Sequence, residues 1–269
     1  MIVSILGCGW YGKALGQALV KSGLTVKGST TSADKFEQLS ALGIDPYAVN
    51  FSAEGETFDA GFFKCDVLVV SIPPKIRHGE TIGFIPKMER IVHTIVKQGI
   101  KKVIYISSTG VYKDDNRIVD ELDYPTPDTD AGRLLLQAEH LFQDTTDFSS
   151  TVIRFAGLVG PGRHPGRFFA GKKDIPNGLS PVNLIHLSDC VAISNTLIEK
   201  DQFGYVINAC SPDHPAKKDF YTAASINAGL PAPEFIDELK EWKQIACKFL
   251  TETLNYQFKV PLWKDCKFD

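Results

Sequence analysis

The first two-thirds of the chain alternate short apolar runs with stretches of helical spacing. Residues 2–6 form an apolar run that stops at Gly7, and residues 13–22 then place their apolar side chains on one helical face. The strands read as continuous Val and Ile runs, which indicates a parallel sheet buried on both faces. The pattern therefore predicts an α/β protein with a Rossmann-type, doubly wound parallel sheet. Further strands are expected at 24–27, 65–72, 102–107, 151–155 and 205–208, and further helices at 32–42, 84–98, 133–142 and 189–198.

After about residue 158 the regular alternation breaks up. A Gly- and Pro-rich stretch, GPGRHPGRFF, covers residues 160–169, and such material is typical of a lobe that closes over a ligand. Its Arg163, His164 and Arg167 indicate either a site for an anionic or sugar-nucleotide substrate or a solvated basic loop. Residues 233–250 show the spacing of an amphipathic helix. We expect a Rossmann domain at 1–158, completed by 184–210, and a smaller C-terminal substrate lobe formed by 159–183 and 211–269.

Composition and charge narrow the function classes. The chain has 269 residues, 43% of them hydrophobic and 23% charged, with a formal net charge of -3. That charge provides no attraction toward nucleic acid or anionic lipid, so neither a nucleic acid nor a membrane is expected as a partner. The six cysteines form no CxxC pair and no zinc-ligand spacing, so no metal is expected. The absence of an export segment and of a membrane-spanning apolar run makes the cytoplasm the expected compartment.

The turn after the first strand carries the clearest chemical signal. It reads GCGWYG, a GxGxxG motif between a strand and a helix. A glycine in the first position permits the tight turn, the second lets a pyrophosphate approach the backbone, and the third allows close packing of helix on strand. The alternative is a purely structural glycine-rich turn. We predict a dinucleotide-binding loop made of Gly7, Gly9, Trp10, Tyr11 and Gly12.

The residues after the second strand bear on which dinucleotide binds. NAD sites of this type usually place an Asp or Glu there to hold the ribose 2′-hydroxyl, but this chain has Ser29, Thr30 and Thr31. Hydroxyls can donate to a 2′-phosphate, and Lys27 and Lys35 could supply positive charge. NADP is therefore favoured over NAD, which stays an alternative, as does a polar loop that only starts a helix. FAD or another nucleotide is a weaker alternative.

With these motifs in place, the chain resembles the extended short-chain dehydrogenases/reductases, in an atypical branch of the NAD-dependent epimerase/dehydratase family. The resemblance runs almost end to end through GCGWYG, SIPP (71–74), YISSTGVY (105–112), RFAGLVGPGR (154–163), LIHLSD (184–189) and INACSPDHP (207–215). It implies a catalytic hydroxyl at Ser108 with Thr109 beside it. It also implies cofactor contacts from Ser71, Ile72, Pro73, Pro74, Ser107, Phe155, Ala156 and Gly157, and a structural role for the His186 and Asp189 pattern.

The chain departs from that family where its acid/base pair belongs. The family has a YxxxK pair, with a Tyr as acid/base and a Lys that lowers its pKa. Alignment on the helix ending QAEHLF places Ala131 and Leu135 there, and neither can transfer a proton. The nearby candidates are Asp128, Asp130 and Arg133, and an arginine is a poor general base. Tyr112 and Tyr124 are alternatives for the proton transfer.

Two classes of function follow. The first is an NAD(P)-dependent oxidoreductase or epimerase-like enzyme acting on a small polar or sugar-derived substrate, such as a nucleotide sugar or another polar carbonyl or hydroxyl compound. The second is a non-catalytic NADP-binding sensor or regulatory protein, which the departure at Ala131 and Leu135 favours. The resemblance also implies pairing into a homodimer through a four-helix contact.

Overall fold

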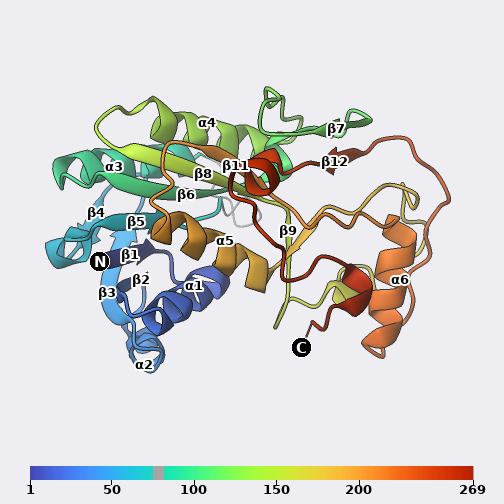
Figure 1. The fold of residues 1–269 in the computed structure, drawn as a ribbon, viewed down its shortest axis with the longest axis horizontal. Helices are drawn as coiled ribbons and strands as arrows, with labels where there is room; N and C mark the ends of the chain where they lie inside the picture. The colour runs from blue at the N-terminus through green and yellow to red at the C-terminus, as the bar shows by residue number, and fades with distance from the viewer. Residues whose placement is uncertain (75–81, 269) are drawn as a thin grey trace. The chain divides into compact units, whose positions relative to one another are not determined.

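The computed structural model describes residues 1–74 and 82–268 of the chain. Its centre is an eight-stranded sheet in the order β11-β8-β6-β5-β1-β2-β3-β4, with helices on both faces (Figure 1). β1 pairs in parallel with β2 and β5, and β4 joins β3 in the antiparallel direction. The predicted α/β fold with a doubly wound, mostly parallel sheet is confirmed.

The strands of this sheet are β1 (Ile2–Leu6), β2 (Thr25–Thr30), β3 (Asp45–Phe51), β4 (Glu56–Phe58), β5 (Val67–Val70), β6 (Lys102–Ser108), β8 (Ser149–Phe155) and β11 (Val206–Ala209). The helices are α1 (Trp10–Lys21), α2 (Phe36–Ser40), α3 (Phe84–Lys97), α4 (Asp130–Asp144), α5 (Leu187–Glu199) and α6 (Lys217–Asn227). Four short strands lie outside the sheet: β7 (Arg117–Val119), β9 (Gly157–Val159), β10 (Leu184–His186) and β12 (Lys243–Ile245).

Contacts between residues divide the chain into two compact units. The first unit comprises residues 1–111, 127–154 and 191–206, and the second comprises 112–126, 155–190 and 207–269. Both units are therefore assembled from segments that are far apart in the sequence. The domain boundaries expected from the sequence remain a prediction.

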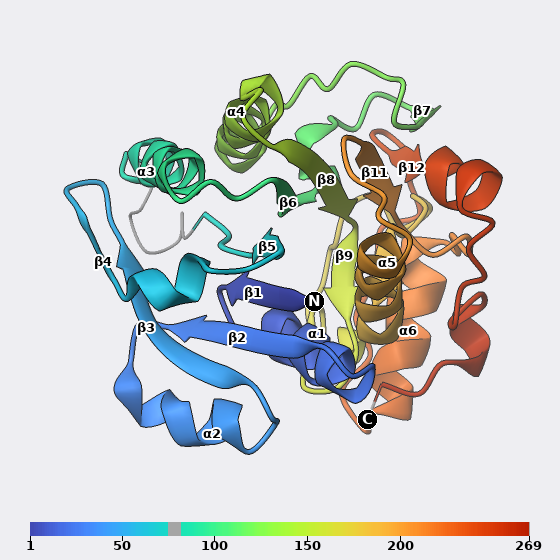
Figure 2. The same ribbon diagram turned by 60° about the vertical axis from the view of Figure 1, so that its left-hand side comes forward.

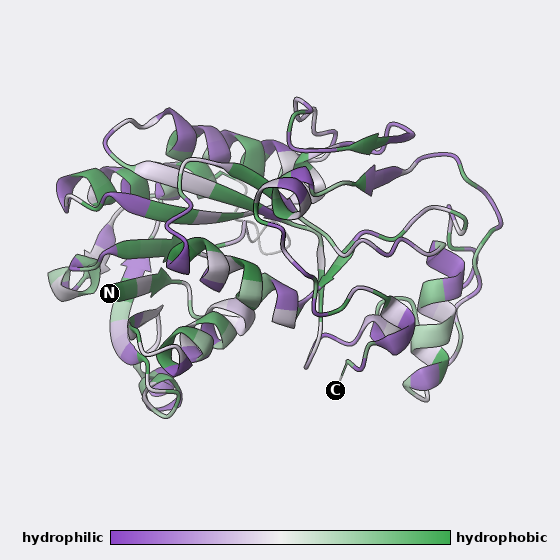
Figure 3. Ribbon diagram, in the orientation of Figure 1, coloured by the Kyte–Doolittle hydropathy of each residue, from purple (hydrophilic) through white to green (hydrophobic). Residues whose placement is uncertain are grey.

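The first unit owes its core to the apolar runs read from the sequence. All four residues of β5 are buried, because a parallel strand covered on both faces presents both sets of side chains to apolar neighbours. Helices α3 and α4 lie on one face of the sheet, and α1 lies on the other (Figure 2). Hydrophobic residues are concentrated on strands such as β1 and β5 (Figure 3). The largest side chains of this core are Phe62, Phe63, Phe84, Tyr105 and Phe142.

A buried ion pair links α4 to the sheet within this unit. Glu139 is 0% exposed and Arg154 is 4% exposed, and Arg154 Nη2 lies 2.6 Å from Glu139 Oε2. The Ser107 hydroxyl donates to Glu139 Oε1 at 2.5 Å. A buried charge is tolerated where a counter-charge and hydrogen bonds compensate for lost solvation, and Glu139 has both.

The second unit contains two small parallel strand pairs, β9 with β10 and β7 with β12, together with α6. Asp189, at the start of α5, forms hydrogen bonds to the C-terminal segment of the second unit. The Asp189 carboxylate accepts hydrogen bonds from the Tyr256 hydroxyl at 2.8 Å and from the backbone N–H groups of Lys259 and Val260 at 2.7 and 3.1 Å. His186 Nδ1 lies 2.8 Å from the Ser188 hydroxyl. These contacts give both residues a structural role, as the resemblance implies.

The prediction of an amphipathic helix at residues 233–250 was wrong. The segment is mostly without regular secondary structure, and its backbone bonds to distant residues of the second unit. Ile236 N–H donates to the Ile175 carbonyl at 2.8 Å, and Lys240 N–H donates to Asn177 Oδ1 at 2.9 Å. β12, within the same segment, pairs with β7. These partners satisfy backbone groups that a helix would have bonded internally, so periodicity alone misled the prediction.

Residues 1–74 and 82–268 contain neither a membrane-spanning helix nor a cluster of metal ligands. No helix in these ranges has the length and apolar character needed to cross a bilayer. No group of three or more His, Cys, Asp or Glu side chains in the same ranges is arranged to hold a metal ion.

Candidate functional site

The glycine turn after β1 is held by the neighbouring strands. Gly7 has φ +109°, and a Cβ built on it would lie 2.5 Å from the carbonyl oxygen of Ser71. The Gly7 N–H donates to the Ser29 hydroxyl at 2.8 Å, and the Cys8 N–H donates to the Ser29 carbonyl at 3.2 Å. Both the positive φ and the close approach therefore require glycine at position 7.

Helix α1 begins directly after this turn. A Cβ on Gly12 would lie 2.3 Å from the Gly7 carbonyl oxygen, so Gly12 lets the helix pack closely on the turn. Gly9 is the N-cap of α1 and makes no side-chain capping bond. A Cβ built on Gly9 meets nothing within 4 Å, so this residue borders open space. The helix N-terminus thus meets space that an anion could occupy.

That space is part of a cavity of about 690 Å³, lined entirely by residues of the first unit. Its walls come from the ends of β1, β2, β3 and β5, from the loop after β3 and from the start of α3. Eight of the predicted cofactor contacts line it: Gly7, Gly9, Ser29, Thr30, Thr31, Ser71, Ile72 and Pro73. The cavity is also lined by residues that no sequence motif indicated, namely Val49–Glu54, Gly83 and Lys87. Parallel strands end at one edge of the sheet, which is why segments so distant meet there.

Several predicted contacts lie elsewhere in the first unit. Trp10 and Tyr11 form the first turn of α1, and the buried Tyr11 hydroxyl lies 2.6 Å from the Ser194 hydroxyl. Gly12 packs on the turn as described, and Pro74 is half-buried at the end of the segment after β5. None of these four residues is among those that line the cavity in the described part of the chain.

The hydroxyl residues at the end of β2 and directly after it differ in what they offer a ligand. Ser29 is buried and accepts from Gly7, and the Thr30 hydroxyl bonds to the backbone of Ser32 at 3.2 Å. Thr31 is exposed and lines the cavity, as does Lys35. The Lys27 ammonium instead donates to the carbonyl oxygens of Gly61 and Lys64, both at 2.7 Å. Of the two lysines suggested by the sequence, Lys35 is the one at the cavity.

The two serines at the end of β6 lie in different environments. The Ser107 hydroxyl is used by Glu139 in the buried ion pair, so Ser107 contributes to the interior of the unit. The half-buried Ser108 hydroxyl accepts from the Gly110 N–H at 3.1 Å, and Thr109 is buried. The Tyr105 hydroxyl is buried, and desolvation, followed by the charge of Glu139, strongly raises its pKa. A phenol in that state is a poor proton donor at neutral pH.

The positions aligned with the missing pair lie in α4. Leu135 is buried and Ala131 is half-buried, next to the N-cap Thr129, whose hydroxyl accepts from the Gly132 N–H at 3.0 Å. Arg133 donates to the Asp128 carbonyl at 2.9 Å and pairs with Asp130 at 2.5 Å. Arg133 therefore serves to secure the start of α4.

The remaining candidates belong to the second unit. The Tyr112 hydroxyl is buried and donates to the Asp120 carbonyl, whereas Tyr124 is 73% exposed. Phe155 and Ala156 are buried, and Gly157 opens β9. Their proposed roles at the nicotinamide stay predictions, as do those of Ser108 and Thr109.

The chain is similar in sequence or in structure to several known proteins. No protein-family model matches it. The Escherichia coli K12 protein YeeZ is 35% identical over 265 residues, which is 96% of each chain. The structure of a functionally unknown conserved protein from Silicibacter pomeroyi superposes with a TM-score of 0.80 at 24% identity, covering 98% of this chain and 95% of that one.

Characterised enzymes share the fold at lower identity. The UDP-glucuronic acid 4-epimerase of Bacillus cereus, in complex with NAD, has a TM-score of 0.79 at 19% identity, covering 98% of this chain and 93% of the epimerase. Another structure of that epimerase holds both UDP-glucuronic acid and NAD. The chain therefore has the fold of the extended short-chain dehydrogenases/reductases, as its motifs predicted, and it belongs to the family of the Escherichia coli protein YeeZ.

Proposed function

We propose that this protein binds a nicotinamide dinucleotide in the cavity of the first unit, and that it prefers NADP to NAD. The carrying observation is the glycine turn, where Gly7 fits only as glycine and Gly9 opens the α1 N-terminus to the cavity. Backbone N–H groups at a helix N-terminus stabilise a pyrophosphate. The NAD in complexes of the Bacillus cereus epimerase supports the same class of cofactor.

The preference for NADP rests on Thr31 and Lys35. Both line the cavity where β2 ends, the place at which this fold usually reads the adenosine ribose. A threonine hydroxyl and an ammonium suit a 2′-phosphate, because a charge-assisted hydrogen bond to a phosphate is stronger than a neutral one. The same two groups give NAD, with its 2′-hydroxyl, no comparable ion pair.

The proposed substrate is a small polar or sugar-derived molecule that carries a carbonyl or hydroxyl group. The Bacillus cereus epimerase with UDP-glucuronic acid supports a nucleotide sugar as one such substrate. The chain's own part in the reaction would be to hold the nicotinamide and orient the substrate, with Ser108 polarising its oxygen. Hydride chemistry is supplied by the bound cofactor. Without a Tyr and Lys at positions 131 and 135, proton transfer is the step that this site supports least.

The second candidate is a non-catalytic NADP-binding sensor or regulator. It is favoured by Ala131 and Leu135, which stand where the family has its Tyr and Lys. The two candidates differ in turnover. Mixing the protein with NADPH and a panel of aldehydes, ketones and nucleotide sugars, while following the absorbance of the reduced nicotinamide, separates them. Turnover that Ser108→Ala lowers supports the enzyme, whereas saturable cofactor binding without turnover supports the sensor.

The binding site itself is tested with a pair of glycine substitutions. Gly9→Ala adds a methyl group that touches no part of the protein, so the fold is expected to survive while the pyrophosphate loses its approach to the backbone. We expect NADPH affinity, measured by calorimetry, to fall by about tenfold or more. Gly55→Ala is the matched control, because it also meets open space but does not line the cavity. Equal NADPH affinity in the two variants would contradict the proposed site.

Lys35→Ala tests the preference for NADP. Removing the ammonium should weaken NADPH about fivefold to tenfold and leave NADH nearly unchanged, because only NADPH carries the 2′-phosphate. Lys21→Ala is the control, since Lys21 is exposed at the end of α1 and away from the cavity lining. Wild-type protein that binds NADH as tightly as NADPH would refute the preference.

The homodimer also stays a proposal, and sedimentation of the protein in solution would test it.

A further inference from the structure

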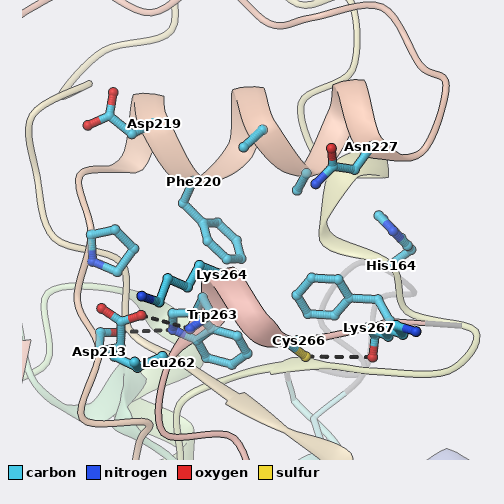
Figure 4. A pocket seen from close by; sticks show the side chains of 14 residues that line it. His164, Asp213, Asp219, Phe220, Asn227, Leu262, Trp263, Lys264, Cys266 and Lys267 are labelled. Carbon is cyan, nitrogen blue, oxygen red and sulfur yellow. Dashed lines mark hydrogen bonds between the residues drawn. The ribbon is translucent and has the colours of Figure 1, made fainter.

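Two adjoining cavities lie wholly within the second unit. The larger, about 570 Å³, is bounded by α6, by the loop at residues 160–169 and by the C-terminal segment (Figure 4). The smaller, about 340 Å³, shares His164, Asn227 and Phe268 with it. Small-molecule sites usually enclose roughly 300–1,000 Å³ and combine an aromatic lining with a few polar groups. The shared residues make the two cavities adjoining compartments.

The wall of the larger compartment is aromatic and fixed in place. Phe220 packs edge-on against Trp263 at a centroid distance of 5.7 Å, and Trp263 lies nearly parallel to Phe268 at 6.1 Å. Asp213 holds Trp263 at two points, because its carboxylate accepts the Trp263 backbone N–H at 2.7 Å and its carbonyl accepts the indole N–H at 2.9 Å. A flat apolar ligand would meet a wall that needs no rearrangement.

The polar groups are distributed unevenly along this wall. Figure 4 shows His164 and Asn227 together at one end, and Asp213 and Asp219 toward the other. His164 Nδ1 accepts the Gly166 N–H at 3.1 Å, so the neutral ring carries its proton on Nε2 and is a donor there. The adjoining smaller compartment adds the guanidinium of Arg167, and no carboxylate is among its described lining residues. This end therefore suits an anionic group.

We propose that the two compartments form a binding site for a small aromatic acid, separate from the dinucleotide cavity. The ring would lie against Phe220 and Trp263, and its carboxylate or phosphate would face Arg167, His164 and Asn227. An arginine beside a histidine Nε2–H and an amide offers several N–H donors to the oxygens of such a group. This role uses the basic loop that the sequence singled out and that dinucleotide binding leaves unexplained.

Calorimetry with four naphthalene probes tests this site. The probes are 2-naphthoate, 2-naphthyl phosphate, 2-naphthol and 2-naphthylmethylamine, which share a ring and differ in charge. We expect the two anions to bind at least about tenfold more tightly than the amine, because only an anion gains from Arg167. The tighter of the two anions identifies the natural head group. Amine binding equal to that of the anions, or no heat from any probe, would overturn the proposal.

Substitutions locate the site and keep it distinct from the cofactor cavity. Ala223→Trp should fill the larger compartment from the exposed side of α6 and weaken the anionic probes about tenfold, whereas Thr222→Trp, one residue earlier and outside both linings, should not. Arg167→Ala should weaken only the anions, with Lys173→Ala as its exposed control. NADPH affinity should be unchanged in all four variants. Anion binding that survives both Ala223→Trp and Arg167→Ala would place the probes elsewhere and refute the site.

Discussion

The two units fix their buried carboxylates in different ways. In the first unit, Glu139 pairs with Arg154 and accepts from Ser107, so side chains join a helix to two neighbouring strands. In the second unit, the buried Asp189 accepts two backbone N–H groups and the Tyr256 hydroxyl, and the half-buried Glu121 accepts the backbone N–H groups of Asn208 and Lys248. Regular strands and helices satisfy their own backbone, whereas irregular chain needs side chains to do so. The second unit therefore depends on a few carboxylates for its order.

Removing one member of the ion pair should produce the largest effect. Glu139→Ala leaves the Arg154 guanidinium buried without its counter-charge, and we expect the free energy of unfolding to fall by about 3–5 kcal/mol. Denaturant titration measures this change. Asp130→Ala, which removes an exposed ion pair from the same helix, should leave stability nearly unchanged. A small loss for Glu139→Ala would mean that the pair adds little to the first unit.

Asp189→Asn should act on the second unit with a smaller effect. An amide has one acceptor oxygen in place of two, so at least one of the three hydrogen bonds is lost, and we expect a loss of about 2–3 kcal/mol. Hydrogen exchange should show faster exchange of the backbone amides at residues 256–268 and little change in β1 and β5. Uniform acceleration across both units would contradict a local role for Asp189.

Lowering the pH should give the smallest change in stability, and this change also arises in the second unit. Burial lowers the pKa of His186 and His214 below the ordinary value of 6.5, so both rings bind a proton less readily in the folded chain than in the unfolded chain. The unfolded chain therefore takes up protons first as pH falls below about 6.5, and the free energy of unfolding should decrease there. The double variant His186→Gln, His214→Gln should show a flatter dependence on pH in denaturant titrations. An unchanged slope would show that neither ring is linked to folding.

How far the sequence predicted the fold depended on the period of its apolar residues. The runs that became β1, β5 and β6 are continuous and apolar, and their strands were located to within a few residues. β3 reads DPYAVNF, in which a proline and polar residues interrupt the apolar pattern, and no strand was predicted there. The structure of the second unit was harder to predict from the sequence, because hydrogen-bonded partners such as Asn177 and Lys240 lie 63 residues apart in the chain.

The residues of the candidate site also fall into two groups, those that the sequence predicted and those that it did not. Gly7, Gly9 and the hydroxyl residues after β2 belong to a motif with fixed spacing, so they could be predicted to lie together. Asn50, Glu54 and Lys87 carry no such spacing, and they reach the cavity because β3 ends and α3 begins beside it. Finding them from sequence would have required β3 to be recognised first.

The central claim is that a nicotinamide dinucleotide occupies the cavity at the glycine turn. Hydrogen exchange with and without saturating NADPH tests this claim most directly, because it reports where the ligand lies. We predict slower exchange at the amides of residues 7–12 and 29–35, with the tail at 256–268 unaffected. Unaltered exchange at the glycine turn, or protection confined to the second unit, would contradict the account.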